Sequence, residues 1–227
     1  MSIVIKTTNE AVSEGGVNIL IYGASGVGKT RLVATAPNPL LISAESNIMS
    51  LADYSVPVIE VNKLVDIIEV YKFLATSKEA AVYETVCLDS ITEIAEIVFS
   101  TVSKTEKDKR AAYGDTGEKV RDLIRDFRDL SRFNTYFSAK MDYVSDEVGR
   151  RFYAPMMPGK KLGFALPYFF NEVFKLDIGV DDNTKESFRY LATEATPTYI
   201  AKDASGKLDP VETPDLTHII NKAKGLY

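Results

Sequence analysis

A glycine-rich segment directly after a short apolar run constrains this chain more than any other feature. Residues 23–30 read GASGVGKT and match the pattern G-x-x-x-x-G-K-[ST]. The run before it, Val17 to Tyr22 (VNILIY), is continuously apolar, which is typical of a strand buried on both faces of a parallel sheet. A helical stretch follows. This pattern forms a phosphate-binding loop when it joins a strand to a helix.

The residue types in this segment suit the binding of a triphosphate. Glycines at 23, 26 and 28 allow a tight turn that aims backbone N–H groups at phosphate oxygens, beside the positive end of the next helix. Lys29 would reach the β- and γ-phosphates, and the Thr30 hydroxyl would bind Mg²⁺. The alternative is a chance glycine turn beside an exposed lysine. We therefore predict ATP and Mg²⁺ as cofactors. The predicted nucleotide-binding residues are Gly23, Ala24, Ser25, Gly26, Val27, Gly28, Lys29, Thr30 and Arg31.

Strand-like and helical patterns alternate along most of the chain. Strand-like runs lie at residues 40–43, 58–61, 85–88, 134–139, 172–177, 187–192 and 198–202. Helical spacing of apolar residues is found at 63–77, 117–133 and 215–223. This alternation predicts an α/β fold with a mainly parallel central sheet, flanking helices and additional C-terminal strands.

Length and composition exclude several classes of protein. The 227 residues suit one compact domain, which we place at residues 17–227 after an N-terminal arm at 1–16. A single cysteine, Cys87, allows no internal disulfide, and no Cys/His cluster offers a zinc site. No run of 18 apolar residues and no export signal is present, so we expect a cytoplasmic protein. A net charge of -5 argues against coating nucleic acid through bulk charge.

Two carboxylates follow strand-like runs. Asp89 ends the run 85–89 and would hold Mg²⁺ through water; alternatively it caps a helix that begins near Ile91. Glu45 lies just past the second run and would polarise the attacking water; alternatively it is a first-turn helix residue favoured by the helix dipole. Both can face the loop, because parallel strands end at one edge of the sheet. Cys87 is interpreted as a small buried hydrophobe.

With these residues the chain resembles a RecA-type ATPase core, and most closely the small phage-encoded RecA-like single-strand annealing proteins. The resemblance covers residues 17–208 and rests on the phosphate loop, the Ala-Glu pair at 44–45 and the Asp-Ser pair at 89–90. It implies a RecA-like P-loop NTPase core and a Mg²⁺-dependent, DNA-stimulated ATPase that acts on single-stranded DNA in annealing or recombination. It also implies a phage origin, the host cytoplasm, a homo-oligomer, and a single-strand-binding protein as a further partner.

The resemblance also assigns roles to two lysines outside the loop. Lys140, at the end of the run 134–140, would sense the γ-phosphate, and Lys202 would reach the nucleotide of a neighbouring subunit. The residues predicted to act in catalysis are then Lys29, Glu45, Lys140 and Lys202.

Two segments without strand or helix periodicity, 103–117 and 141–161, are predicted to be mobile loops, and the resemblance makes both of them binding loops for single-stranded DNA. In the second, cations would follow phosphates while aromatic rings stack on bases. The alternative is an exposed hairpin whose charges are merely solvated. The predicted DNA-binding residues are Arg150, Arg151, Phe152, Tyr153, Lys160 and Lys161.

Two other functions are compatible with the same phosphate loop. A small-molecule or nucleotide kinase would also need an acceptor pocket and a lid with basic groups. A nucleotide-dependent switch or loader would bind ATP without strong turnover. The one histidine, His218, lies between hydrophobic positions and has no companions for a metal site or a triad, so we expect a partly buried surface residue.

Overall fold

The computed structural model describes residues 5–45, 47–145 and 148–226, except the side chains of 11, 160 and 161. The strands are β1 (Asn18–Gly23), β2 (Pro39–Ser43), β3 (Val58–Glu60), β4 (Thr85–Asp89), β5 (Asn134–Ser145), β6 (Arg151–Pro155), β7 (Glu172–Val180), β8 (Ser187–Ala192), β9 (Lys202–Asp203) and β10 (Val211–Glu212). The helices are α1 (Thr8–Glu14), α2 (Lys29–Leu32), α3 (Leu64–Thr76), α4 (Ile91–Val102), α5 (Lys109–Arg128), α6 (Lys160–Ala165) and α7 (Leu216–Lys224).

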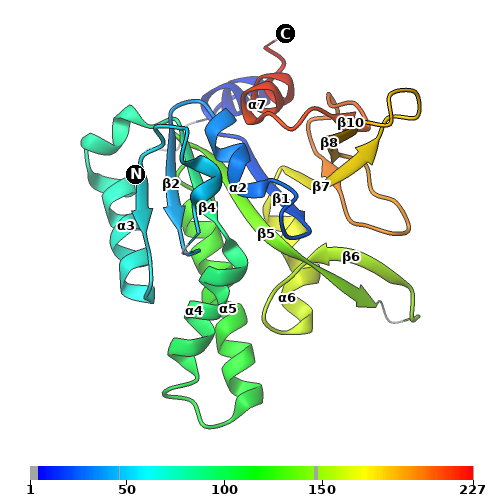
Figure 1. Cartoon of the computed structure of the whole chain (residues 1–227). Helices are drawn as coiled ribbons and strands as arrows, with labels where there is room; N and C mark the ends of the chain where they lie inside the picture. Colours follow the sequence, from blue (N-terminus) through cyan, green and yellow to red (C-terminus); the bar gives the residue numbers. More distant parts are fainter. Residues whose placement is uncertain (1–4, 46, 146–147, 227) are drawn as a thin grey trace.

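The strands form one sheet in the order β10-β8-β7-β1-β5-β4-β2-β3, with β6 added to β5 and β9 added to β7. Every pair from β7 through β1, β5, β4 and β2 to β3 is parallel, whereas β6, β8, β9 and β10 pair in antiparallel fashion. Helices flank the sheet (Figure 1). The predicted α/β class, with a mainly parallel sheet and additional C-terminal strands, is confirmed.

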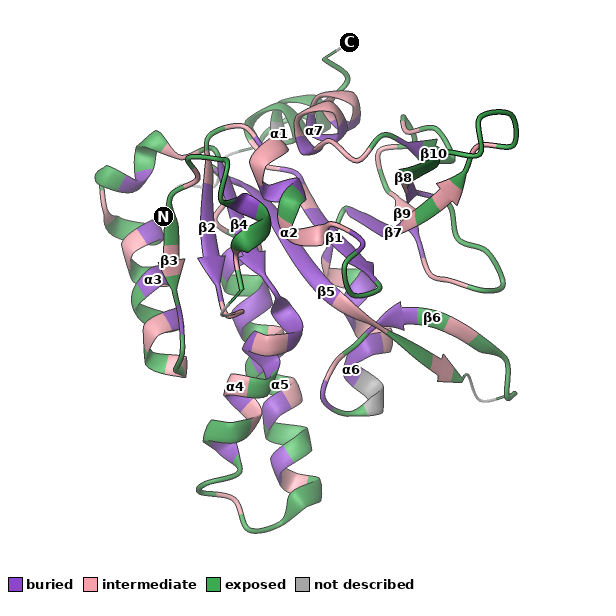
Figure 2. Cartoon of the chain, viewed as in Figure 1, coloured by how far each residue is buried: buried purple, intermediate pink, exposed green. Residues whose placement is uncertain are grey.

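The core lies on both faces of the central strands, which explains why β1 is apolar throughout. Leu20 and Tyr22 pack into a cluster with residues of α3, α4 and α5, whereas Ile19 and Ile21 pack into a second cluster with residues of α7. Successive side chains of a strand point to opposite faces, so a strand covered on both sides needs apolar residues at every position. Figure 2 shows these central strands buried between exposed outer surfaces.

The prediction of a mobile loop at residues 103–117 is wrong for most of that segment. Helix α5 begins at residue 109, and Asp108 caps it by accepting a hydrogen bond from the Arg110 N–H at 2.8 Å. Helices α4 and α5 lie side by side and project from the sheet (Figure 1). The buried positions of this first part of α5 are Ala112 and Thr116, whose small or polar side chains give no apolar stripe in the sequence.

The prediction of a mobile loop at 141–161 is also wrong in part. Strand β5 continues to residue 145 and pairs with β6, with Tyr143 opposite Tyr153, so the described part of this segment is largely a hairpin followed by the start of α6. Most of the hairpin is exposed. Its polar composition hides the strands from a pattern search, because exposed strands need no apolar alternation.

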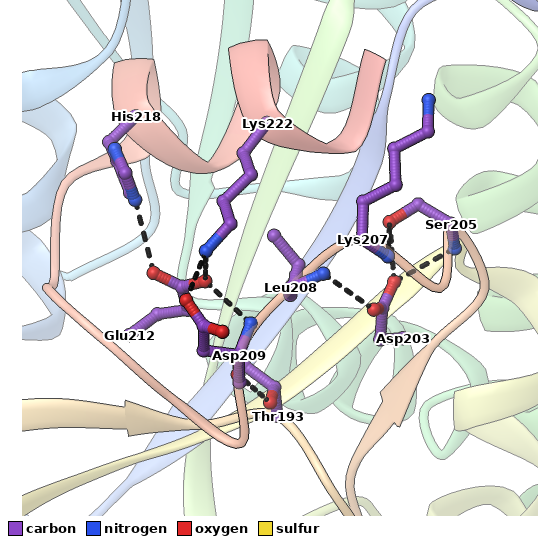
Figure 3. A network of polar contacts seen from close by, with 9 residues as sticks. All are labelled: Thr193, Asp203, Ser205, Lys207, Leu208, Asp209, Glu212, His218 and Lys222. Carbon is purple, nitrogen blue, oxygen red and sulfur yellow. Dashed lines mark hydrogen bonds and ion pairs between the residues drawn. The ribbon is translucent and has the colours of Figure 1, made fainter. Parts of the chain in front are cut away.

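The buried carboxylate of Glu212 on β10 binds two side chains of the C-terminal helix α7. Glu212 accepts hydrogen bonds from Lys222 and lies 3.0 Å from the ring nitrogen Nε2 of His218, and Lys222 also binds Asp209 (Figure 3). His218 is half-buried, as expected. Asp215 caps the helix by accepting from the His218 N–H at 2.8 Å. None of the described helices is both long enough and apolar enough to cross a membrane.

Candidate nucleotide-binding site

The glycine-rich segment forms a turn between β1 and α2 at the carboxyl edge of the sheet. Gly26 (φ 76°) and Gly28 (φ 112°) have left-handed backbone conformations that other residues adopt only with strain. A Cβ atom on Gly23 would lie 2.6 Å from the carbonyl oxygen of Leu176, so β7 leaves no room for a side chain there. The Val27 side chain is only 3% exposed and anchors the turn in the core. The glycines therefore leave the backbone of the turn without side chains at the positions where phosphate oxygens would approach it.

The Lys29 ammonium group lies over this turn. Its Nζ donates hydrogen bonds to the carbonyl oxygens of Gly23 at 2.9 Å and Ala24 at 2.8 Å. Burial lowers the pKa of Lys29, and the nearby carboxylates of Asp89 and Glu45 partly oppose that shift. Phosphate oxygens entering the turn would compete with the two carbonyl groups for this ammonium group.

Within the turn, Ala24 and Ser25 are exposed, and Arg31 of α2 is exposed as well. The Arg31 guanidinium donates a hydrogen bond to the Tyr54 hydroxyl at 3.2 Å. These three residues therefore border the site on its solvent side.

Asp89 ends β4 next to the loop and is 2% exposed. The Thr30 hydroxyl donates to its Oδ2 at 2.6 Å, and the Ser138 hydroxyl of β5 donates to its Oδ1. Burial raises the pKa of Asp89, although the two hydroxyl groups act in the opposite direction. Asp89 is not the cap of α4, because that role belongs to Ser90, whose Oγ accepts from the Glu93 N–H.

This donor set fits Mg²⁺. The ion prefers oxygen ligands, is commonly held by one or two protein groups together with phosphates and water, and would find a hydroxyl and a carboxylate side by side at Thr30 and Asp89. In the described residues, no group of three or more His, Cys, Asp or Glu side chains is placed to hold a metal.

Glu45 lies at the end of the neighbouring strand β2. Its Oε1 accepts a hydrogen bond from the Ser90 hydroxyl at 2.8 Å, and the backbone N–H of Ala44 donates to the Asp89 carbonyl at 2.9 Å. Glu45 precedes the short 3-10 turn that starts at Met49, so it is not a first-turn helix residue. The two strand ends thus bring Glu45 to the same edge as the loop and Asp89. Its chemical role stays a prediction.

The two lysines outside the loop have partners elsewhere. Lys140 pairs with Gly23 in the register of β5 and β1, yet its Nζ forms an ion pair with Glu93, which raises the pKa of Lys140. Contact with a γ-phosphate would require this pair to open. Lys202 pairs with Val173 near the opposite end of the sheet, and its Nζ donates to the Phe170 carbonyl at 2.7 Å. Within its own chain, Lys202 is therefore remote from the loop.

The predicted DNA-binding residues lie on the β5–β6 hairpin and at the start of α6. Arg150 and Arg151 are exposed. The Phe152 ring packs edge-to-face against Phe164, with centroids 5.6 Å apart, which leaves it less available for a base. The side chains of Lys160 and Lys161 lie outside the described residues.

A third aromatic residue on this hairpin, Tyr143, was not predicted from the sequence. Tyr143 is 52% exposed and lies beside Tyr153, with ring centroids 5.0 Å apart. The only available signal was its place opposite Tyr153, which requires knowledge of the hairpin register.

Three contacts near the nucleotide site were not predicted. Ser138 binds Asp89, Ser90 binds Glu45, and Arg189 of β8 donates to the Val27 carbonyl at 2.8 Å. Ser138 could have been found as a polar residue within an apolar strand, and Ser90 belongs to the Asp-Ser pair already noted in the sequence. Arg189 carries no such signal, because it is 162 positions from Val27.

A phosphate loop between the first strand and a helix, with carboxylates at the ends of neighbouring strands, defines a P-loop NTPase. A family model described as an AAA domain matches residues 16–205, and the chain belongs to this AAA domain family. Among solved structures, the chain is similar to the KaiC-like protein PH0186 from the hyperthermophilic archaeon Pyrococcus horikoshii OT3. That match has 14% identity and a TM-score of 0.45, and it covers 78% of this chain and 77% of the other. No curated protein matches the chain.

Proposed function

We propose that this protein is a Mg²⁺-dependent ATPase that acts on single-stranded DNA during annealing or recombination. The observation that carries the ATPase part is the contact between Thr30 and Asp89 beside a glycine turn with two left-handed residues. A hydroxyl, a carboxylate and the Lys29 ammonium group meet there at one edge of a parallel sheet. This is the set of groups that a metal-bound triphosphate requires.

The residues of the chain bind and orient the triphosphate. Backbone N–H groups of the turn and Lys29 bind phosphate oxygens, while Thr30 and Asp89 hold the metal. Bound Mg²⁺ supplies positive charge that offsets the charge of the phosphates. Glu45 accepts a proton from the attacking water, and the Ser90 hydroxyl, 2.8 Å away, fixes the orientation of that carboxylate.

The DNA part of the proposal is supported by the hairpin that leaves the same site. Strand β5 carries Ser138 at the nucleotide site and Tyr143 on the exposed hairpin, and the two are separated by about 17 Å of extended strand. Arg150 and Arg151 add positive charge to a chain of net charge -5. Cations and exposed tyrosine rings together suit a single strand bound without sequence preference.

The proposal extends to the assembly and its setting. In a homo-oligomer, Lys202 would reach the nucleotide of a neighbouring copy; in its own chain it lies on β9, which pairs with β7. We also propose a phage origin, a place in the host cytoplasm, and contact with a single-strand-binding protein.

ATP hydrolysis measured with and without single-stranded DNA tests the proposal, together with the mass of the protein in each nucleotide state. We expect hydrolysis that DNA stimulates and that Lys29→Ala abolishes. ATP binding without turnover under both conditions would favour a switch or loader instead. Phosphoryl transfer to an added nucleoside or nucleotide, without DNA stimulation, would favour a kinase.

A further inference from the structure

An arginine from the antiparallel extension of the sheet reaches the phosphate loop from outside the nucleotide site. The Nε–H group of Arg189 donates a hydrogen bond to the carbonyl oxygen of Val27 at 2.8 Å. Strand β8, which carries Arg189, is separated from β1 by β7. The contact therefore joins two parts of the molecule that share no backbone pairing.

The sheet register explains why Arg189 can reach the loop. Tyr22 of β1 pairs with Lys175 of β7, whereas Arg189 pairs with Ile178, which is three residues further along β7. Three residues of extended strand span about 10 Å. Strands β7 and β8 therefore continue past the end of β1 and flank the space in which the loop turns.

The phosphate loop is held at Val27 by two separate contacts. The Val27 side chain is buried in the core, while its carbonyl group binds Arg189. A Cβ atom on Gly28 would lie 3.3 Å from Nε and 3.5 Å from Cδ of Arg189, so the arginine lies directly against the left-handed turn. Gly28 is thus required by its backbone conformation, and a side chain there would press against Arg189.

We infer that Arg189 is a positioning residue that holds the phosphate loop in its triphosphate-binding conformation. The inference rests on the proposed nucleotide site, because it assigns the arginine to that loop. The group of Arg189 that positions the loop is the Nε–H donor. Its hydrogen bond fixes the orientation of the Val27 carbonyl group, and because the peptide unit is planar it also fixes the direction of the next backbone N–H. A hydrogen bond from a charged donor is stronger than a neutral one, so its loss shifts the loop population measurably.

Three substitutions distinguish the effect of the Arg189 Nε–H donor from the effect of the positive charge. Arg189→Gln keeps an N–H donor at the position of Nε, because the Gln amide nitrogen also follows Cδ, but removes the charge. Arg189→Lys keeps the charge and places its donor one bond further out. Arg189→Met has similar length and neither group. Arg110→Met, on the exposed first turn of α5, is the matched control.

The affinity for ATP with Mg²⁺, measured by calorimetry without DNA, tests the inference. We expect about tenfold weaker binding for Arg189→Met, which corresponds to about 1.4 kcal/mol, and binding near the wild-type value for Arg189→Gln. In turnover, KM should rise with kcat nearly unchanged, because the loop binds more weakly but the chemical groups remain. The thermal midpoint of each variant separates this effect from a general loss of stability.

Two results would overturn the inference. Wild-type affinity in Arg189→Met would show that the contact has no role in binding. Loss of affinity in Arg189→Gln together with wild-type affinity in Arg189→Lys would show that charge matters and the Nε–H donor does not. Neither result affects the proposed function, which fails instead if the wild-type protein does not bind ATP or if Lys29→Ala binds it equally well.

Discussion

The hydroxyl of Thr30 donates a hydrogen bond to the carboxylate of Asp89 at 2.6 Å, although 59 positions separate the two residues in the chain. Thr30 lies in α2, directly after β1, and Asp89 ends β4. Strand β5 lies between β1 and β4, and its Ser138 binds the second carboxylate oxygen. This contact links the phosphate loop to the end of β4 through side chains alone. Thr30 and Asp89 are the residues that would hold Mg²⁺ when it arrives with the triphosphate.

Replacement of Lys29 by Ala should strongly weaken nucleotide binding. Its ammonium group already donates to two loop carbonyls, so its loss removes charge-assisted hydrogen bonds to phosphate. We expect ATP affinity to fall by about 100-fold in titration calorimetry. The exposed Lys72 of α3 provides the control, and equal losses in Lys29→Ala and Lys72→Ala would contradict the assigned site.

The Glu45→Gln variant should bind ATP but hydrolyse it slowly. Gln keeps the shape of the side chain and can still bind the Ser90 hydroxyl, yet it cannot accept a proton from water. We expect kcat to fall by about 10²–10⁴-fold, with ATP affinity within about threefold of the wild type. Glu60→Gln is the matched control, because Glu60 is exposed at the end of the neighbouring strand and pairs with Ser43. Normal turnover in Glu45→Gln would remove Glu45 from the chemistry.

Removal of Arg150 and Arg151 should weaken the binding of single-stranded DNA and reduce its salt dependence. Each lost phosphate contact should flatten the plot of log K against log salt by about 0.7, because fewer counterions are released from the strand. Fluorescence anisotropy with a labelled oligonucleotide at several salt concentrations measures this slope. The exposed pair Lys72 and Lys78 serves as the control. An unchanged slope in the double arginine variant would exclude this hairpin from the DNA site.

The Tyr143→Leu variant tests whether DNA bases stack on the hairpin, independently of the charge of its arginines. The ring is 52% exposed beside Tyr153, so its loss should weaken DNA binding by about 1–3 kcal/mol without changing the salt slope. The same anisotropy titration gives both quantities. A changed slope with unchanged affinity at low salt would argue against base stacking on this residue.

Glu172 should make the stability of the fold depend on pH. This residue is 1% exposed, its Oε2 finds no hydrogen-bond partner in the described part of the chain, and burial together with Asp203 raises the pKa of Glu172 to about 8. The unfolded chain releases this proton near pH 4.5, whereas the folded chain holds it to about pH 8. The unfolded state thus binds fewer protons across that interval, so stability falls as pH rises through it and levels off above about pH 8.

Glu172→Gln removes this dependence, because an amide needs no proton to stay neutral. We expect the variant to gain about 1–3 kcal/mol near pH 9 and little near pH 4, seen as a higher thermal midpoint only at the higher pH. Asp203→Asn is a useful contrast: Asp203 accepts hydrogen bonds from the N–H groups of Ser205, Gly206 and Leu208, so its loss should destabilise the protein. An equal gain for Glu172→Gln at both pH values would contradict the assigned titration.

The parts of the fold that the sequence predicts well are those that depend on neighbouring residues. The strand at residues 18–23 follows from a continuous apolar run, which is typical of a strand buried on both faces. The turn after it follows from glycines, which adopt φ values of 76° and 112° without strain. Asp89 and Glu45 were placed at one edge because parallel strands deliver their carboxyl ends together. Small buried residues such as Ala112 concealed the first half of α5, since no apolar stripe marks it.

By itself, then, the sequence determined a phosphate loop, an α/β sheet and the carboxylates at its edge, because each is encoded within a few consecutive residues. Only the tertiary structure decided that Lys140 pairs with Glu93, that Ser138 binds Asp89 and that Arg189 binds the loop. These partners depend on strand order and register across the sheet. Side chains that meet in this way come from distant positions, and a local pattern encodes the backbone conformation of a segment but not which distant segment packs beside it.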